Sequence, residues 1–157
     1  MEHVQKLENS LDALFGNGVS KYLPKDIEIT FSRKTGRIRT VSQKGKLLCT
    51  LRIDGGLAIS THFAQILLKS KSFKENCIHI NQDAAPFVME GRSVFCKHVI
   101  KCGKNVQISG DTPVLFKNKV IAVGKAVLSC EMISDFNQGV AVKVRDSLKS
   151  RNEEKQL

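Results

Sequence analysis

The sequence predicts an α+β fold of two small domains, an N-terminal antiparallel sheet with helices and a C-terminal β-barrel that contains little helix. Two observations support this prediction. Apolar residues recur first at helical and then at alternating spacing up to residue 69, whereas after residue 76 most apolar runs alternate. The polar stretch 69–76 is the best candidate for a boundary. We therefore assign residues 1–72 and 73–150 to the two domains and residues 151–157 to a frayed tail.

In the first domain we expect a helix followed by strands. Apolar residues between Val4 and Phe15 recur at helical spacing, and Gly16 follows where a helix should stop. Ile27, Ile29 and Phe31 then alternate with polar residues, which is typical of a half-buried strand. The remaining expected elements are a short helix at 18–23, strands at 37–41 and 46–53 joined as a hairpin through 43–45, a turn at 54–56, one more short strand, and a helix at 63–68.

In the second domain strands dominate. A first strand is expected at 77–81, followed by a short helix that Asp83 caps and Gly91 ends, with Ala84, Phe87 and Val88 on its buried face. Pro86 fits the first turn of that helix, where its missing amide hydrogen has no partner to lose. The remaining expected elements are strands at 93–100, 112–116, 120–127 and 140–145 and a helical turn at 131–136.

The cysteines and the hydropathy indicate an intracellular environment. Five cysteines are odd in number and scattered, which does not fit a disulfide framework, so we expect buried thiols in a reducing compartment. No apolar run approaches the roughly 18 residues that span a bilayer, and the first residues do not form a signal peptide. We therefore expect a cytoplasmic protein without a membrane partner.

The positive charge is clustered. The formal charge of +10, from 25 Lys and Arg against 15 Asp and Glu, makes polyanions the first partners to consider. Between Phe31 and Ile53 there are seven basic residues and no acidic one: Arg33, Lys34, Arg37, Arg39, Lys44, Lys46 and Arg52. Arg37 and Arg39 lie two positions apart on a predicted strand, so they share a face and can reach one phosphate backbone.

A second acid-free cluster lies in the C-terminal half, where Arg92, Lys97, Lys101 and Lys104 follow Gly91. In the last predicted strand, Lys143 and Arg145 share the solvent face while the alternating valines face a core. Each of these cations taken singly fits an ordinary solvated side chain. Their clustering favours nucleic acid.

No catalytic or cofactor motif is present in the sequence. It contains neither a phosphate-binding loop nor a dinucleotide fingerprint, and its histidines suggest no catalytic triad. Cys96, His98 and Cys102 match no standard zinc spacing and are better explained as buried strand residues. Asp54, Asp83 and Asp111 adjoin turn residues, where aspartate usually caps or turns the backbone. We therefore expect no catalytic residue, metal or cofactor.

Several strings resemble a known family. In the second half these are 91–100 (GRSVFCKHVI), the turn at 110–111, 123–129 (VGKAVLS) and 139–145 (GVAVKVR), which resemble the PUA domain that ends archaeosine tRNA-guanine transglycosylases. In the first half 15–18 (FGNG), 32–41 (SRKTGRIRTV) and 48–57 (LCTLRIDGGL) resemble the domain that precedes PUA in those enzymes. The resemblance runs from about residue 14 to residue 145 and implies that the expected barrel is a PUA β-pseudobarrel.

The resemblance also implies a function. In that family the PUA domain holds the acceptor stem of tRNA, while a catalytic barrel with aspartates and a zinc site exchanges the base. The barrel has no counterpart in these 157 residues, so we expect a non-catalytic tRNA-binding protein. The leading hypothesis is the RNA-recognition subunit of a split transglycosylase that acts beside a separate catalytic chain. The alternative is a free-standing PUA factor acting in translation or on ribosomes, and a stand-alone enzyme with an unfamiliar site is a third possibility.

The resemblance also selects contact residues. The first-rank RNA contacts are Gly91, Arg92, Ser93, Phe95 and Lys97, and the second-rank contacts are Lys125, Lys143 and Arg145. Gly91 would allow close approach of the RNA backbone and the cations would neutralise phosphates, whereas for Phe95 a place in the core is favoured over stacking on a base. Arg37, Arg39 and Arg52 represent the N-terminal cluster, for which contact with RNA or with a protein partner stays open.

Overall fold

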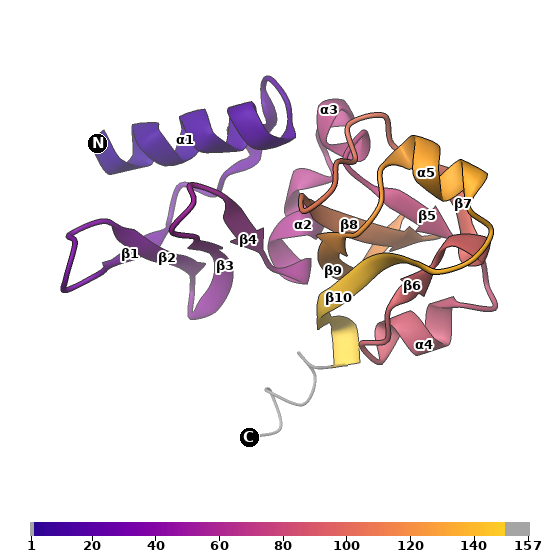
Figure 1. Ribbon diagram of the computed structural model, residues 1–157. Helices are drawn as coiled ribbons and strands as arrows, with labels where there is room; N and C mark the ends of the chain where they lie inside the picture. The colour runs from indigo at the N-terminus through magenta and orange to yellow at the C-terminus, as the bar shows by residue number, and fades with distance from the viewer. Residues whose placement is uncertain (1, 150–157) are drawn as a thin grey trace. The chain divides into compact units, whose positions relative to one another are not determined.

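The computed structural model describes residues 2–149, and the chain divides into two compact units, residues 1–73 and 74–157 (Figure 1). The predicted tail 151–157 lies outside the described residues. Both helices and antiparallel sheets are present, which confirms the predicted α+β class. None of the helices within residues 2–149 is long and apolar enough to cross a membrane.

Unit 1 is a four-stranded antiparallel sheet with strands in sequence order. Its elements are α1 (Glu2–Phe15), η1 (Val19–Tyr22), β1 (Glu28–Phe31), β2 (Ile38–Gln43), β3 (Lys46–Leu51), β4 (Leu57–Ile59), α2 (Thr61–Leu67) and α3 (Lys71–Lys74), the last of which runs one residue past the unit boundary. Helix α1 lies along one face of the sheet (Figure 1). Leu7 and Leu11 on α1 are almost fully buried, as their helical spacing predicts.

The β2–β3 hairpin forms where the sequence predicts it. Its loop is the dipeptide Lys44-Gly45, and both residues have positive φ, 50° and 78°. Two consecutive left-handed residues give the turn whose twist matches that of the flanking strands. Lys117 and Asn118 form a similar connection between two strands of unit 2, with φ of 50° and 62°.

The polar stretch 69–76 contains the division between the two units, and it also contains α3, whose Phe73 is completely buried and contacts Phe15 edge to face. One detail of unit 1 differs from the sequence prediction. Strand β1 is at the sheet edge, so its Phe31 is 43% exposed and contacts His3 rather than entering the core.

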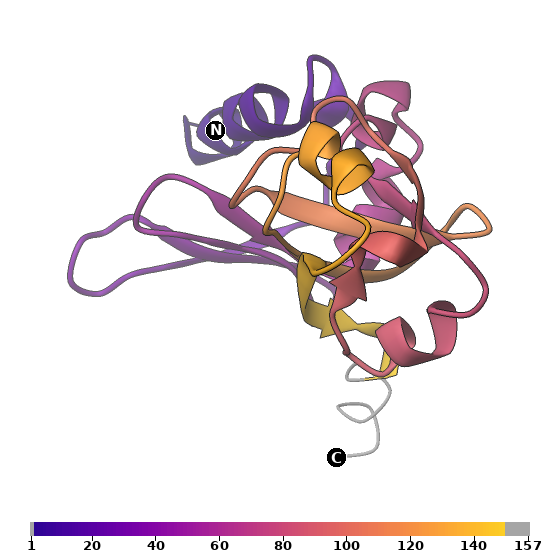
Figure 2. The same ribbon diagram turned by 45° about the vertical axis from the view of Figure 1, so that its right-hand side comes forward.

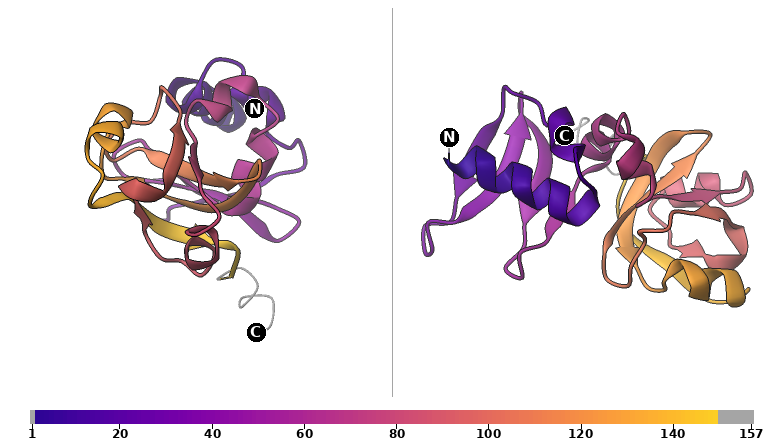
Figure 3. Two further views of the ribbon diagram at one scale, coloured as in Figure 1. Left: turned by 90° about the vertical axis from the view of Figure 1, so that its right-hand side faces the viewer. Right: turned by 90° about the horizontal axis from the view of Figure 1, so that it is seen from above.

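Unit 2 is a six-stranded, nearly closed sheet with the order β6-β10-β9-β8-β5-β7 (Figures 2 and 3). Its elements are β5 (Ile78–Ile80), α4 (Ala85–Met89), β6 (Val94–Phe95), η2 (Cys96–His98), β7 (Val99–Cys102), β8 (Asp111–Phe116), β9 (Lys119–Ala126), α5 (Cys130–Asp135) and β10 (Val140–Ser147). The end strands β6 and β7 are consecutive in sequence and joined by η2, which brings the two ends of the sheet together. The predicted small barrel is thereby confirmed.

The predicted strand 93–100 is wrong as a single element. It is broken into β6 and β7 by η2, where the Cys96 amide donates a hydrogen bond to the Gly139 carbonyl at 2.9 Å. The chain turns a barrel corner at this point, which local alternation cannot reveal. Cys96 and His98 therefore lie in a 3₁₀ turn and do not share a strand face.

The start of α4 also differs from the prediction. Asp83 does not cap the helix; Ala84 occupies the N-cap position, and Asn81 Oδ1 accepts a hydrogen bond from its amide at 3.1 Å. Ala84 and Val88 are buried as predicted, but Phe87 is 52% exposed. Pro86 lies in the first turn as expected.

The close approach of β9 and β10 in unit 2 depends on Gly124. A Cβ built at Gly124 of β9 would lie 2.1 Å from the carbonyl oxygen of Lys143 on the paired strand β10. That separation is far below any van der Waals contact, and the neighbouring atoms are backbone and cannot rotate away. Only glycine lets β9 and β10 pair in this register.

We predict that Gly124→Ala lowers the free energy of unfolding by about 2–3 kcal/mol, because the β9–β10 ladder must shift to accommodate the methyl group. The measurement is urea unfolding followed by circular dichroism. The neighbouring exposed residue gives a control, since Lys125→Ala should change stability by no more than about 0.5 kcal/mol. Equal stability of the Gly124→Ala variant and the original protein would show that the strands are not held as closely as described.

Candidate nucleic-acid interface

The corner between α4 and β6 is fixed by a helix-terminating motif. Gly91 has φ of +101°, and its amide donates to the Val88 carbonyl at 3.0 Å. The next amide, that of Arg92, donates to the Phe87 carbonyl at 3.0 Å. This pair of bonds is a Schellman motif, which requires a left-handed residue at the glycine position. Gly91 thus has a structural reason to be glycine, and it directs Arg92 away from the helix end.

Arg92 and two aromatic rings are exposed at this corner. The Arg92 guanidinium carbon lies 5.5 Å from the centroid of the Phe87 ring, a cation–π arrangement. Phe95 is 46% exposed, and Val94 before it is completely buried in the core. The expectation that Phe95 fills the core is therefore wrong, because β6 alternates with Val94 inward.

The other first-rank residues lie next to these. Ser93 is half-buried before β6, and Lys97 is exposed in η2. The sequence thus singled out Arg92, Ser93, Phe95 and Lys97 on one short segment, but it missed the exposed ring of Phe87. The sequence did contain a signal for the exposure of Phe87. The predicted helix is short, so only one of its sides can face a core, and the adjacent residues Phe87 and Val88 cannot both point to that side.

A second set of cations lies on β9 and β10. Lys125 and Lys143 are directly opposite one another across the two strands, and both are exposed. Like charges placed opposite each other on a sheet destabilise it, so this pair does not help the fold. The pair is suited instead to an anion that bridges both ammonium groups.

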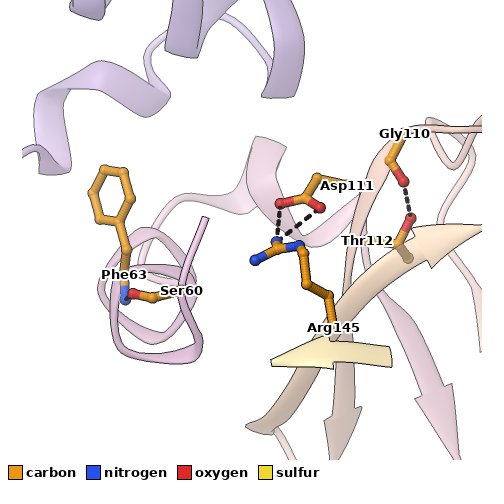
Figure 4. A network of polar contacts seen from close by, with 6 residues as sticks. All are labelled: Ser60, Phe63, Gly110, Asp111, Thr112 and Arg145. Carbon is orange, nitrogen blue, oxygen red and sulfur yellow. Dashed lines mark hydrogen bonds and ion pairs between the residues drawn. The ribbon is translucent and has the colours of Figure 1, made fainter. Parts of the chain in front are cut away.

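Arg145 is held by an aspartate. Its Nη2 lies 2.8 Å and 3.0 Å from the two carboxylate oxygens of Asp111, whose side chain is only 3% exposed (Figure 4). The Thr112 hydroxyl donates to the Gly110 carbonyl at 3.1 Å and holds the start of β8 in place. Asp111 thus pairs with a cation and is more than a turn residue, and it neutralises part of the charge that Arg145 presents.

The four-stranded sheet of unit 1 presents different residues on its two faces. One row of paired residues (Ile29, Val41, Cys49 and Ile59) runs across the four strands, and its last three members are completely buried. The adjacent row is Thr30, Thr40, Thr50 and Ala58, which must point to the opposite face because strand side chains alternate. Helix α1 lies along the face of the buried row (Figure 1), so the threonine row lies on the face opposite α1.

The three candidate arginines of unit 1 differ in position and exposure. Arg39 is the unpaired extra residue of a β-bulge between β1 and β2, where strict alternation is interrupted. Arg37 and Arg39 are both exposed, whereas Arg52 is half-buried beside the β3–β4 turn. The Arg52 amide donates to the Gly56 carbonyl at 2.8 Å, and Asp54 Oδ1 accepts from the Gly56 amide at 2.9 Å, so Asp54 stabilises the turn as the sequence predicts.

The described residues contain no cluster of side chains that could bind a metal ion. Among residues 2–149 no three His, Cys, Asp or Glu side chains are close enough together to hold a metal ion. Cys96 is buried, while His98 and Cys102 are half-buried.

We predict that Arg145→Met lowers the free energy of unfolding by about 1–3 kcal/mol, because it removes a cation from the nearly buried Asp111 carboxylate. Chemical denaturation is the measurement. Lys143→Met is the matched control on the same strand, and it should leave stability unchanged or raise it slightly, since it relieves repulsion by Lys125. Equal losses for the two variants would contradict a specific role of the Arg145–Asp111 ion pair.

Two family models match consecutive parts of the chain. Residues 6–74 match the patch-forming domain C2 of tRNA-guanine transglycosylase, and residues 76–148 match the PUA domain. The tRNA-guanine(15) transglycosylases of Methanothermobacter thermautotrophicus and Methanosphaera stadtmanae are 32% and 37% identical to this chain over 148 and 136 residues. These alignments cover 92% and 85% of this chain but 23% and 19% of the relatives, so the chain spans about a fifth of the curated relatives it matches.

Solved structures share the fold at lower identity. A hypothetical protein, PH0734.1, from Pyrococcus horikoshii OT3 superposes with a TM-score of 0.75 at 18% identity, covering 99% of this chain and 96% of that one. A conserved PUA domain protein from Thermoplasma acidophilum gives a TM-score of 0.61 at 16% identity, with 89% of each chain covered. The chain therefore consists of a patch-forming domain C2 followed by a PUA domain, and it is homologous to the C-terminal, non-catalytic region of archaeal tRNA-guanine(15) transglycosylases.

Proposed function

We propose that this chain is a tRNA-binding protein of the cytoplasm that recognises the RNA for an archaeosine-type tRNA-guanine transglycosylase and does not catalyse base exchange by itself. The observation that carries this proposal is the corner after α4. There a PUA domain presents an arginine, a lysine and two aromatic rings on a backbone fixed by two hydrogen bonds. Similarity to the C-terminal region of enzymes that act on tRNA supports the choice of ligand.

The corner has the chemistry to hold the end of an RNA helix. Arg92 can grip a phosphate through two parallel hydrogen bonds, and Lys97 adds a second cation on the same segment. The exposed rings of Phe87 and Phe95 suit an unstacked terminal base, since stacking on aromatic rings is worth about 1–3 kcal/mol per base. An acceptor stem offers both groups, because its A-form duplex exposes phosphates and its end is single-stranded.

The pair Lys125 and Lys143 provides a further contact for RNA in unit 2. Lys125 and Lys143 are cross-strand partners on β9 and β10, so their side chains extend from the same face and one bound phosphate would relieve their repulsion. Arg145 contributes less to phosphate binding than these lysines, because Asp111 already neutralises much of its charge.

The threonine face of unit 1 suits a sugar–phosphate backbone. Hydroxyl groups are short, donate hydrogen bonds and leave the surface flat, and Arg37 and Arg39, beside and within the start of β2, are exposed. The threonine row itself carries no aromatic or large apolar side chain, which favours contact with a sugar–phosphate backbone over base stacking on this row. RNA is therefore preferred here over a protein partner, which would bury apolar side chains.

We propose that base exchange is carried out by a separate catalytic chain. The aligned region is about a fifth of the relatives' length and corresponds to their C-terminal, non-catalytic part. RNA held by these residues must then be presented to a catalytic barrel that they do not include. The two proteins would act together on one tRNA.

A second candidate is a free-standing PUA factor that acts in translation or on ribosomes. The observation in its favour is that this two-part fold accounts for 96% of the Pyrococcus horikoshii chain, so the fold also occurs without a large additional domain in a solved chain. Co-sedimentation with ribosomes in a sucrose gradient separates the two candidates.

We predict that the affinity for tRNA falls steeply as salt is raised, because each neutralised phosphate releases a condensed counterion. Replacing both Arg92 and Lys97 with alanine should make the slope of log affinity against log salt shallower by about two, one for each lost phosphate contact. The measurement is a fluorescence-anisotropy titration at several salt concentrations.

The matched control removes the same charge elsewhere in unit 2. Lys117 and Lys119 flank Asn118 at the β8–β9 hairpin, and their double alanine variant should keep the original slope. If both double variants lower the slope equally, binding depends on total charge and the corner is not the site.

We also predict that purification of the tagged protein from its native source recovers tRNA together with a zinc-containing base-exchange enzyme. Treatment with ribonuclease before elution tests whether the two proteins touch directly or share an RNA. Recovery of tRNA with no transglycosylase would contradict the two-chain proposal and leave RNA binding standing. Recovery of ribosomal particles would favour the second candidate.

A further inference from the structure

Two cysteines far apart in sequence meet at one end of unit 2. Cys102 is the last residue of β7 and Cys130 is the first residue of α5, 28 positions later. The Cys130 thiol donates to the carbonyl oxygen of Cys102 at 3.3 Å. The Cys102 thiol donates to the carbonyl oxygen of Gly103 at 3.7 Å, so both thiols lie against the same short stretch of backbone. The other three cysteines are buried, whereas Cys102 and Cys130 are both partly exposed.

The backbone around Cys102 is held rigidly. The Gly103 amide donates to the Cys77 carbonyl at 2.9 Å, and the Asn105 amide donates to the Glu75 carbonyl at 2.9 Å. A Cβ on Gly103 would lie 2.2 Å from the Glu75 carbonyl oxygen, so this loop is in close contact with the preceding segment. Cys102 therefore has little freedom to move away from its neighbour.

Cys130 is held from its own side. Ser129 caps α5 by accepting a hydrogen bond from the Met132 amide at 3.4 Å, and the Ser134 hydroxyl donates to the Cys130 carbonyl at 3.2 Å. Ile133 on the same helix is buried in the core. Both thiols are thus fixed in place by elements that pack independently.

The two thiols are not equivalent. Burial, and secondarily the neighbouring Cys130 thiol, raises the pKa of Cys102, so Cys102 stays a protonated thiol. The thiolate is the nucleophile in thiol–disulfide exchange. Attack on an external disulfide is therefore expected from Cys130, and Cys102 is placed to react second.

We infer that Cys102 and Cys130 are an oxidation site that closes to an intramolecular disulfide when a small disulfide compound is present. The Cys130 sulfur attacks one sulfur of the compound, breaks its S–S bond and expels one thiolate, leaving a mixed disulfide on Cys130. The Cys102 sulfur then attacks Cys130, gives its proton to the departing thiolate and expels the second thiol. The protein loses two hydrogen atoms, and the small disulfide is reduced to two thiols.

The bond would tie the start of α5 to the end of β7. It would close a loop of 28 positions and restrict the unfolded chain, so the oxidised form should unfold at a higher temperature than the reduced form. Dithiothreitol should reverse this shift. The inference concerns the thiols alone and is independent of RNA binding.

The test treats the full chain with oxidised glutathione and measures its intact mass and its tryptic peptides. The expected product has lost two of five thiols and carries no glutathione. Trypsin should release the peptide 102–104 linked to the peptide 126–143, because Lys101, Lys104, Lys125 and Lys143 bound these segments. Five remaining thiols, a stable glutathione adduct or a linked peptide containing another cysteine would each overturn the inference.

Variants separate the two steps. Cys102→Ser should trap glutathione on Cys130, whereas Cys130→Ser should leave Cys102 unmodified. Cys96→Ala is the control, since Cys96 is buried on η2 and its removal should leave the linked peptide unchanged. Glutathione trapped on Cys102 in the Cys130→Ser protein would contradict the assigned order. The peptide map of the original protein tests the bond even where a variant fails to fold.

Discussion

The pairing of β9 with β10 is the constraint on which unit 2 depends. Gly124 lets the two backbones approach within a distance that no side chain would allow. Strand β10 then carries β6 on its other edge, and β6 contains Val94 of the core and the exposed Phe95. The same pairing sets Lys125 opposite Lys143 and brings Arg145 within reach of Asp111. The pairing of β9 with β10 thus sets the position of β6 and of Lys125, Lys143 and Arg145, which are among the candidate RNA contacts in unit 2.

The placement of some lysine side chains in this protein lowers the stability of its fold. Lys125 and Lys143 are paired opposite each other across β9 and β10, so folding brings two like charges together. Folding tolerates this because the affected groups are largely exposed and screened by salt. Such a pair of like charges is expected where a bound polyanion relieves their repulsion. Clustered cations are therefore better evidence for nucleic-acid binding than net charge.

The candidate site was only partly readable from the sequence. Arg92, Lys97 and Lys143 could be selected because acid-free runs and strand alternation are local properties, whereas Lys125 was implied by the family resemblance alone. Phe87 was missed and Phe95 was expected in the core rather than exposed, since an aromatic residue beside a buried valine is ordinarily a core residue. The threonine row was missed because it depends on how four strands pair, and a β-bulge at Arg39 displaces the register that alternation would predict.

The sequence by itself determined the fold class, the first helix, the hairpin at Lys44-Gly45 and the identity of the two domains, because helical spacing, turn residues and family strings are local in the chain. Only the tertiary structure decided which side chains meet. The Arg145–Asp111 ion pair joins residues 34 positions apart, and the Cys102–Cys130 contact joins residues 28 apart. The physical reason is that folding of the barrel brings together segments that are far apart in the sequence. Such contacts leave no periodic pattern in a short stretch of sequence.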